Sequence, residues 1–125
     1  MIKLQTTGRH FELDAKIMEY IEKKIGNLDK FLPRGTGEVS GSVILELDES
    51  HTADSQCISE IEIDVKGERM HAREETVNMY AAIDICEQKL KAQILRYKSK
   101  HEPAKNRRRK LFAKMLGREP IITEE

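Results

Sequence analysis

The sequence predicts a two-layer α+β domain of order βαβββα, with a four-stranded sheet and two helices packed on one of its faces. Two long segments repeat apolar residues at steps of three and four, as amphipathic helices do. Four short segments alternate apolar and polar residues, as half-buried strands do. Clean alternation leaves one sheet face to be covered, and the two helices are its natural cover.

The first three elements are expected to form a β-α-β unit. Residues 2–7 alternate as a strand, which Gly8 is expected to break. A helix should run from Ala15 to about Phe31, with Asp14 in the position of an N-cap. A strand at residues 38–48 follows. The first two strands should therefore be parallel and joined by a right-handed crossover.

The second half of the domain is expected to add two strands and a long helix. The strands cover residues 56–65 and 68–73, with a tight turn at Lys66-Gly67 between them. The helix covers residues 79–100. Its apolar stripe consists of Met79, Tyr80, Ile83, Cys86, Leu90, Ile94 and Tyr97.

The formal net charge is zero, with 22 basic and 22 acidic residues, but the charges are unevenly distributed. Residues 38–64 hold eight acids and no Lys or Arg, whereas residues 89–118 hold twelve bases and one acid. The acids expected on the open sheet face are Glu46, Asp48, Glu60, Glu62 and Asp64. Such separated charge favours binding of a polyanion by the helix side.

The long helix carries its bases outside the apolar stripe. Lys89, Arg96 and Lys100 share one side, Lys91 and Lys98 lie on the other flank, and no acid occurs from Lys89 to Lys100. An ordinary solvated face is the alternative, but such faces usually mix signs to form i,i+4 pairs. We therefore favour contacts with RNA phosphates, which need charge and reach. On the first helix, Lys16, Lys23 and Lys30 recur at steps of seven.

Nothing in the sequence indicates an enzyme, a metal site, a cofactor or a small-molecule substrate. The four histidines are scattered, and no histidine pairs with a cysteine or carboxylate at ligand spacing. Cys57 and Cys86 are expected to be buried free thiols, which favours a cytoplasmic location. The longest apolar runs are too short to span a bilayer, so no membrane contact is expected. Tyr80 and Tyr97 should pack in the core, whereas Tyr20 lies off its helix stripe and could stack on a base.

The chain resembles the family of ribosome hibernation-promoting factors and ribosome-associated inhibitor A of bacteria and plastids. The matching residues are Thr7-Gly8-Arg9-His10, Leu28-Asp29-Lys30-Phe31, Met79-Tyr80-Ala81-Ala82-Ile83-Asp84, Lys89-Leu90, Gln93, Arg96, Lys98 and Lys100. The resemblance implies a translation inhibitor that occupies the mRNA channel of the small subunit, near the A and P sites of idle ribosomes. It would exclude mRNA, tRNA and initiation factors in stationary phase or stress.

The same resemblance implies partners and contact residues. The partners are the small (30S) subunit, its 16S rRNA and the 70S ribosome, with a separate ribosome modulation factor as a further partner of some short members. Lys23, Lys24, Lys89, Arg96, Lys98 and Lys100 match basic family positions, and helical spacing adds Lys16 and Lys30. The expected RNA-binding set is Arg9, Lys16, Lys23, Lys24, Lys30, Lys89, Lys91, Arg96, Lys98 and Lys100.

The chain departs from the family pattern mainly in its C-terminal part. Residues 1–100 are expected to form the hibernation-factor domain, and 101–125 a flexible tail that is first basic and then acidic. Arg107, Arg108, Arg109 and Lys110 are its candidate RNA or partner contacts. Ala92 stands where many members have Arg, and Asn78 where many have Asp. Two alternatives remain: a general double-stranded RNA binder, and a protein-interaction module that uses the acidic sheet face or the tail.

Overall fold

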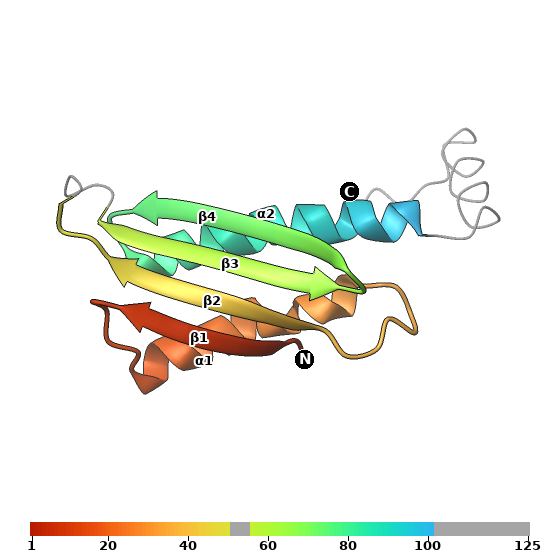
Figure 1. Cartoon of the computed structure of the whole chain (residues 1–125), viewed down its shortest axis with the longest axis horizontal. Coiled ribbons are helices and arrows are strands. Elements are labelled where there is room, and N and C mark those ends of the chain that lie inside the picture. The colour runs from red at the N-terminus through yellow and green to blue at the C-terminus, as the bar shows by residue number, and fades with distance from the viewer. Residues whose placement is uncertain (51–55, 102–125) are drawn as a thin grey trace, which may run out of the picture.

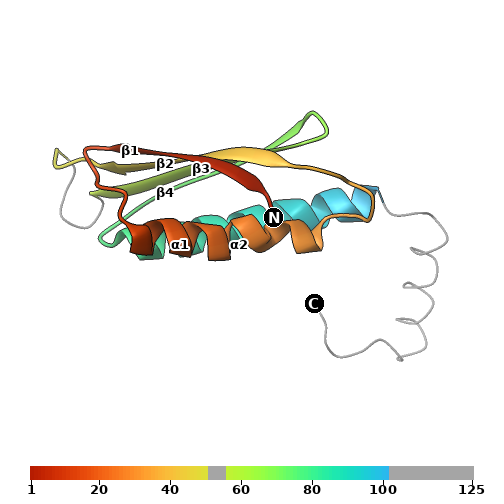
Figure 2. The same ribbon diagram turned by 90° about the horizontal axis from the view of Figure 1, so that it is seen from below.

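Four strands form one sheet in the order β1-β2-β3-β4, with β1 parallel to β2 and the other pairs antiparallel. The computed structural model describes residues 1–50 and 56–101. The elements are β1 (Lys3–Arg9), α1 (Ala15–Lys24), the 3₁₀ helix η1 (Gly26–Phe31), β2 (Ser40–Leu47), β3 (Cys57–Val65), β4 (Glu68–Thr76) and α2 (Met79–Lys100). Both helices lie on one face of the sheet, α1 beneath β1 and β2 and α2 beneath β3 and β4 (Figures 1 and 2). The predicted α+β class is thus confirmed.

The core lies between the sheet and the two helices. Its fully buried side chains include Ile17, Ile21, Val43, Leu45, Ile61, Ile63, Ile83, Leu90 and Ile94. The predicted stripe of α2 is buried along its length, except that Tyr80 is only half-buried. The N-cap prediction for α1 is also confirmed, because the Asp14 carboxylate accepts a hydrogen bond from the Ile17 amide at 2.9 Å. At the Lys66-Gly67 turn both residues have positive φ, as a two-residue hairpin requires.

The expectation that Gly8 breaks the first strand is wrong. β1 continues through Gly8, which pairs with Leu45 of β2, and ends at Arg9. A Cβ atom added to Gly8 would collide with the Phe11 carbonyl oxygen and press against Leu13. Gly8 is therefore needed because the chain folds back closely over the strand, and not because the strand ends there.

The predicted first helix is also divided. α1 ends at Lys24, and Gly26–Phe31 continue as a 3₁₀ helix. The Gly26 carbonyl accepts the Ile2 amide at 2.9 Å, so it is not part of a continuing α-helical ladder. The chain thereby ties the start of the sheet to the end of α1.

The last strand is longer than predicted. It reaches Thr76, which pairs with Cys57 at the start of β3. The alternation fails here because Glu74 occupies a position on the helix side, where a strand usually places an apolar residue. Its carboxylate is ion-paired with Lys89 of α2. A polar residue on the inner side of β4 is thus satisfied by the helix beneath it.

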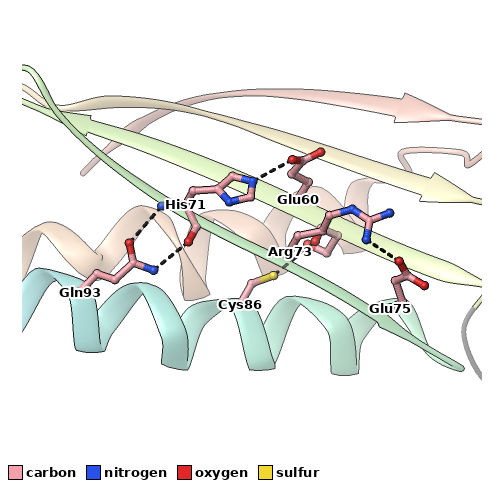
Figure 3. A network of polar contacts seen from close by, with 7 residues as sticks. Glu60, His71, Arg73, Glu75, Cys86 and Gln93 are labelled. Carbon is pink, nitrogen blue, oxygen red and sulfur yellow. Dashed lines mark hydrogen bonds and ion pairs between the residues drawn. The ribbon is translucent and has the colours of Figure 1, made fainter.

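The outer edge of β4 is held by Gln93 of α2. The Gln93 side chain accepts the His71 amide at 3.1 Å and donates to the His71 carbonyl at 2.8 Å. The His71 ring lies 2.7 Å from the Glu60 carboxylate of β3 (Figure 3). This chain of contacts fixes α2 against the sheet edge and satisfies backbone groups that an edge strand would leave unpaired.

α1 and α2 are joined to each other by a polar contact as well. The Tyr20 hydroxyl of α1 donates to the Asp84 carboxylate of α2 at 2.5 Å. Lys24 lies 3.8 Å from the same carboxylate and 3.9 Å from Glu87. The hydrogen bond to Asp84, with burial as the next cause, raises the pKa of Tyr20 to about 12. The hydroxyl therefore stays protonated and remains a donor.

Gly8→Ala tests the role of close approach at β1. We expect the free energy of unfolding in urea to fall by about 1–3 kcal/mol, because the added methyl group must displace backbone or the Leu13 side chain. Thr7→Ala, at the exposed neighbouring position, is the matched control and should cost less. Equal unfolding midpoints for the two variants would contradict this account.

Asp84→Asn tests the contact between the helices. Removing the carboxylate should lower the pKa of Tyr20 from about 12 towards its ordinary value of 10.0, measured by tyrosinate absorbance. Because the folded-state pKa is raised, the stability linked to this bond is complete below pH 10 and is lost as pH rises through about 12. Tyr20→Phe removes one of the three tyrosines, so the part of the absorbance titration that it lacks belongs to Tyr20. An unchanged Tyr20 titration in Asp84→Asn would show that the carboxylate does not hold the proton.

Candidate nucleic-acid interface

The outward side of α2 is divided into two basic rows and a ridge between them. At about 100° per residue, Lys91 and Lys98 form an α1-side row, about half a turn away from a β4-side row of Lys89, Arg96 and Lys100. From residue 88 to residue 99 the positions between the rows are uncharged: Gln88, Ala92, Leu95 and Ser99. The packing of the apolar stripe therefore places basic side chains along both flanks of the C-terminal half of this helix.

The β4-side row is largely paired with acids of the adjacent strand. Lys89 is ion-paired with Glu74, and Lys100 lies 3.4 Å from Glu68. Arg96 has no ion pair among the described residues. Exposed ion pairs contribute little stability, so a polyanion can compete for these lysines, but only by displacing a carboxylate. The row is thus less positive than the sequence suggested.

The α1-side row is positioned by an aromatic ring. The Lys91 ammonium lies 4.6 Å from the centroid of Phe31 in η1, and the Lys30 ammonium lies 5.2 Å from the same centroid. Attraction between each cation and the ring holds both ammonium groups beside Phe31, one from η1 and one from α2. Neither lysine is ion-paired with an acid among residues 1–50 and 56–101. The structure thus places two predicted residues from different elements beside the same ring, with their charges uncompensated by an acid in the described residues.

The lysines of α1 also differ in whether an acid of the domain compensates their charge. Lys24 is only one-third exposed and faces both Asp84 and Glu87 of α2. Its charge is therefore compensated within the domain. Lys16 and Lys23 have no ion pair within the described part of the chain. Lys16 instead lies over the ring of Tyr80, 6.0 Å from its centroid.

Two parts of the predicted set do not join this surface. Arg9 lies on the open face of the sheet, since it pairs with Glu46 of β2 and shares the outward side of β1 with Lys3. It is therefore separated from the helix bases by the sheet itself. Residues 107–110 lie outside the described residues.

Two basic residues near the C-terminal end of α2, Arg34 and Lys66, are absent from the predicted set. A hollow of about 280 Å³ is lined by Pro33, Arg34, Thr36, Lys66, Glu68, Tyr97 and His101. The His101 ring stacks on Tyr97 with centroids 4.2 Å apart. Arg34 and Lys66 belong to loops before β2 and between β3 and β4, so no helical periodicity marks them. Only the topology, which brings both loops to the end of α2, could have identified them.

The open sheet face is less acidic than expected. Cross-strand pairing places Arg69 opposite Asp64, His71 opposite Glu62 and Arg73 opposite Glu60. The His71 ring contacts the Glu60 carboxylate, whereas Arg73 is ion-paired with Glu75 of its own strand. Arg69 stands directly opposite Asp64, so the charge of this acid of β3 is partly compensated by β4. The expected separation into a basic helix side and an acidic sheet side therefore holds only in part.

The described residues offer little for catalysis. They contain no group of three or more His, Cys, Asp or Glu side chains able to hold a metal ion. Both cysteines are free thiols, but only Cys86 is buried as expected, whereas Cys57 is half-buried. Burial raises the pKa of both thiols, which makes them weak nucleophiles. In the same part of the chain, no helix has the length and apolar character required to cross a membrane.

Comparison with known proteins identifies the family. A family model described as Sigma 54 modulation protein / S30EA ribosomal protein matches residues 4–102. A ribosome hibernation promotion factor of Lactococcus lactis subsp. cremoris (strain MG1363) is 33% identical over 100 residues, which are 80% of this chain and 51% of that protein. The chain spans about half the length of the curated relatives it matches.

Solved structures agree with this assignment. The crystal structure of the Thermus thermophilus Protein Y N-terminal domain is 31% identical, with a TM-score of 0.66, and the match covers 78% of this chain and 99% of that one. A ribosomal subunit interface protein from Coxiella burnetii has a TM-score of 0.62 at 22% identity, covers 78% of this chain and 99% of its own, and supports the fold alone. The resemblance seen in the sequence is confirmed: the chain belongs to the Sigma 54 modulation protein / S30EA ribosomal protein family.

Proposed function

We propose that this chain silences idle ribosomes by binding 16S rRNA of the small (30S) subunit. It would occupy the mRNA channel near the A and P sites, in free subunits or 70S ribosomes, and exclude mRNA, tRNA and initiation factors. The observation that carries the proposal is a set of basic side chains, on the helix layer of a family-matched fold, that have no ion pair among residues 1–50 and 56–101. They are Lys16, Lys23, Lys30, Lys91, Lys98 and Arg96.

The mechanism is occupancy, and it needs no catalytic group. Each lysine or arginine that meets a phosphate releases condensed counterions, so binding is driven by charge and weakens as salt rises. A-form RNA is recognised largely through its backbone and shape, which suits helix-borne bases with long side chains. Because packing and polar contacts fix α1, η1 and α2 against one sheet, the backbone positions that carry the basic groups are set before binding. Binding therefore orders the basic side chains but not the helices.

The proposal extends to partners and domain organisation. A ribosome-bound role places the chain in the cytoplasm. Residues 1–100 would form the rRNA-binding domain and residues 101–125 an accessory segment, whose Arg107-Arg108-Arg109-Lys110 run would touch RNA or a ribosome modulation factor.

One observation favours general binding of double-stranded RNA as a second candidate. The uncharged ridge of α2, flanked by basic rows, could enter the shallow minor groove while the rows contact both backbones. Competition separates the candidates. A duplex binder is displaced from ribosomes by a comparable amount of duplex RNA, whereas a ribosome factor is displaced only by a large excess.

Charge reversal of the α1-side row tests the proposed surface. Lys91→Glu with Lys98→Glu should reduce co-sedimentation with small subunits at least about tenfold, because two phosphate contacts become repulsive. In a matched pair of neutral variants, Lys91→Gln with Lys98→Gln, the log–log salt dependence should become less steep by about 1.5.

The control reverses the same number of charges on the opposite side of the domain, the open face of the sheet. Lys3→Glu with Arg9→Glu alters the open sheet face and should bind small subunits almost as the parent chain does. If this pair loses binding and the Lys91/Lys98 pair keeps it, the RNA surface lies on the sheet side and the proposal is wrong. The unfolding midpoint of each variant excludes a loss of fold.

Removal of residues 104–125 tests the domain proposal. We expect two properties to stay within about threefold of those of the full chain: co-sedimentation with small subunits and inhibition of translation in a cell-free system. The reason is that the shortened chain keeps the lysine and arginine side chains of the helix layer. A loss of binding at low salt, with the fold intact, would show that the tail supplies essential contacts.

A further inference from the structure

A hollow between α1 and the start of α2 differs from the other basic parts of the helix layer because its wall is aromatic. Its volume is about 600 Å³, and it is lined by Lys16, Glu19, Tyr20, Lys23 and Tyr80. Both tyrosines are half-buried. Sites of this size that combine an apolar wall with a few polar groups are typical of small ligands and single ligand groups.

The aromatic wall is fixed before any ligand arrives. The rings of Tyr20 and Tyr80 meet edge to face, 4.8 Å apart between centroids with an 83° interplanar angle. The Tyr20 hydroxyl is held by Asp84 at 2.5 Å, and the Lys24 ammonium lies 5.6 Å from the centroid of the Tyr20 ring. Tyr20 therefore acts as a rigid support that sets the orientation of Tyr80.

The rim of the hollow carries charge suited to a nucleotide. Lys16 lies above the Tyr80 ring, so a group that stacks on this face of the ring takes the place of the Lys16 ammonium, which is then free to contact an adjoining phosphate. Lys16 and Lys23 have no acidic partner among the described residues, and both stand beside the aromatic wall. The single acid, Glu19, is an acceptor that suits the exocyclic amino group of adenine, cytosine or guanine.

We infer that this hollow takes one unpaired nucleobase of single-stranded RNA, stacked on Tyr80, with Lys16 and Lys23 contacting the adjoining phosphates. A flat aromatic group joined to anions complements a flat aromatic wall bordered by two ammonium groups. The inference rests on the proposed function, since it makes the hollow part of the same RNA surface. It adds recognition of an extruded nucleobase to a surface whose other proposed contacts are all with RNA phosphates.

Binding of short RNA to the full chain tests this inference directly. The two probes are a short oligoadenylate and a strand of equal length and charge that lacks the bases. The sequence has no Trp and 3 Tyr, so intrinsic fluorescence reports on the tyrosines. We expect the parent chain to bind oligoadenylate about five- to a hundredfold more tightly than the abasic strand, with quenching of the fluorescence by the bases.

Two substitutions at one position locate the effect. Tyr80→Phe keeps the ring and should keep the preference for oligoadenylate, whereas Tyr80→Leu removes the ring and should bind both strands equally. Equal affinity of the parent chain for the two strands, or no binding of either at low salt, overturns the inference without depending on any variant.

Co-sedimentation with small subunits separates this inference from the proposed function. Binding of subunits without discrimination between the two strands would leave the proposed function intact and remove the base site. Discrimination without binding of subunits would support the base site and contradict the ribosomal role.

Discussion

The packing of the apolar stripe of α2 against the sheet is the interaction on which the rest of the structure depends. Ile83, Leu90 and Ile94 are fully buried, so the helix has one permitted rotation about its axis. That rotation places one basic row beside η1, another beside β4, and an uncharged ridge between them. Gln93, which binds the His71 backbone, fixes the same orientation from the sheet edge. Core packing thus determines where the charges stand.

Ion pairs between these lysines and acids of the same domain then determine which of the charges are available to a polyanion. Lys24, Lys89 and Lys100 face carboxylates, so a polyanion would have to compete with internal partners at these positions. Lys30 and Lys91 instead adjoin the ring of Phe31, which attracts cations without cancelling their charge. Two lysines of one helix can therefore differ in function although the sequence makes them look alike.

Local patterns in the sequence predicted most of the fold, because the features concerned repeat along the chain. The bounds of α2 and the Lys66-Gly67 turn follow from short-range periodicity and turn chemistry. The parallel pairing of β1 and β2 follows from the order of the elements, because a β-α-β unit joins parallel strands. What could not be predicted depends on contacts between distant segments. The closeness of Gly8 to the Phe11 carbonyl, the Glu74–Lys89 pair and the Tyr20–Tyr80 wall require the tertiary arrangement. The position of Arg9 on the open face follows from strand parity, which the resemblance to a family does not consider.

The central claim is that the helix layer, and not the open sheet face, lies against ribosomal RNA. Lysine acetylation of the full chain, with and without small subunits and read by mass spectrometry, measures this most directly. The account predicts that Lys23, Lys30, Lys91 and Lys98 lose reactivity in the complex, while Lys3 on the open face stays reactive. Protection of Lys3 with continued reactivity of Lys91 and Lys98 would contradict it.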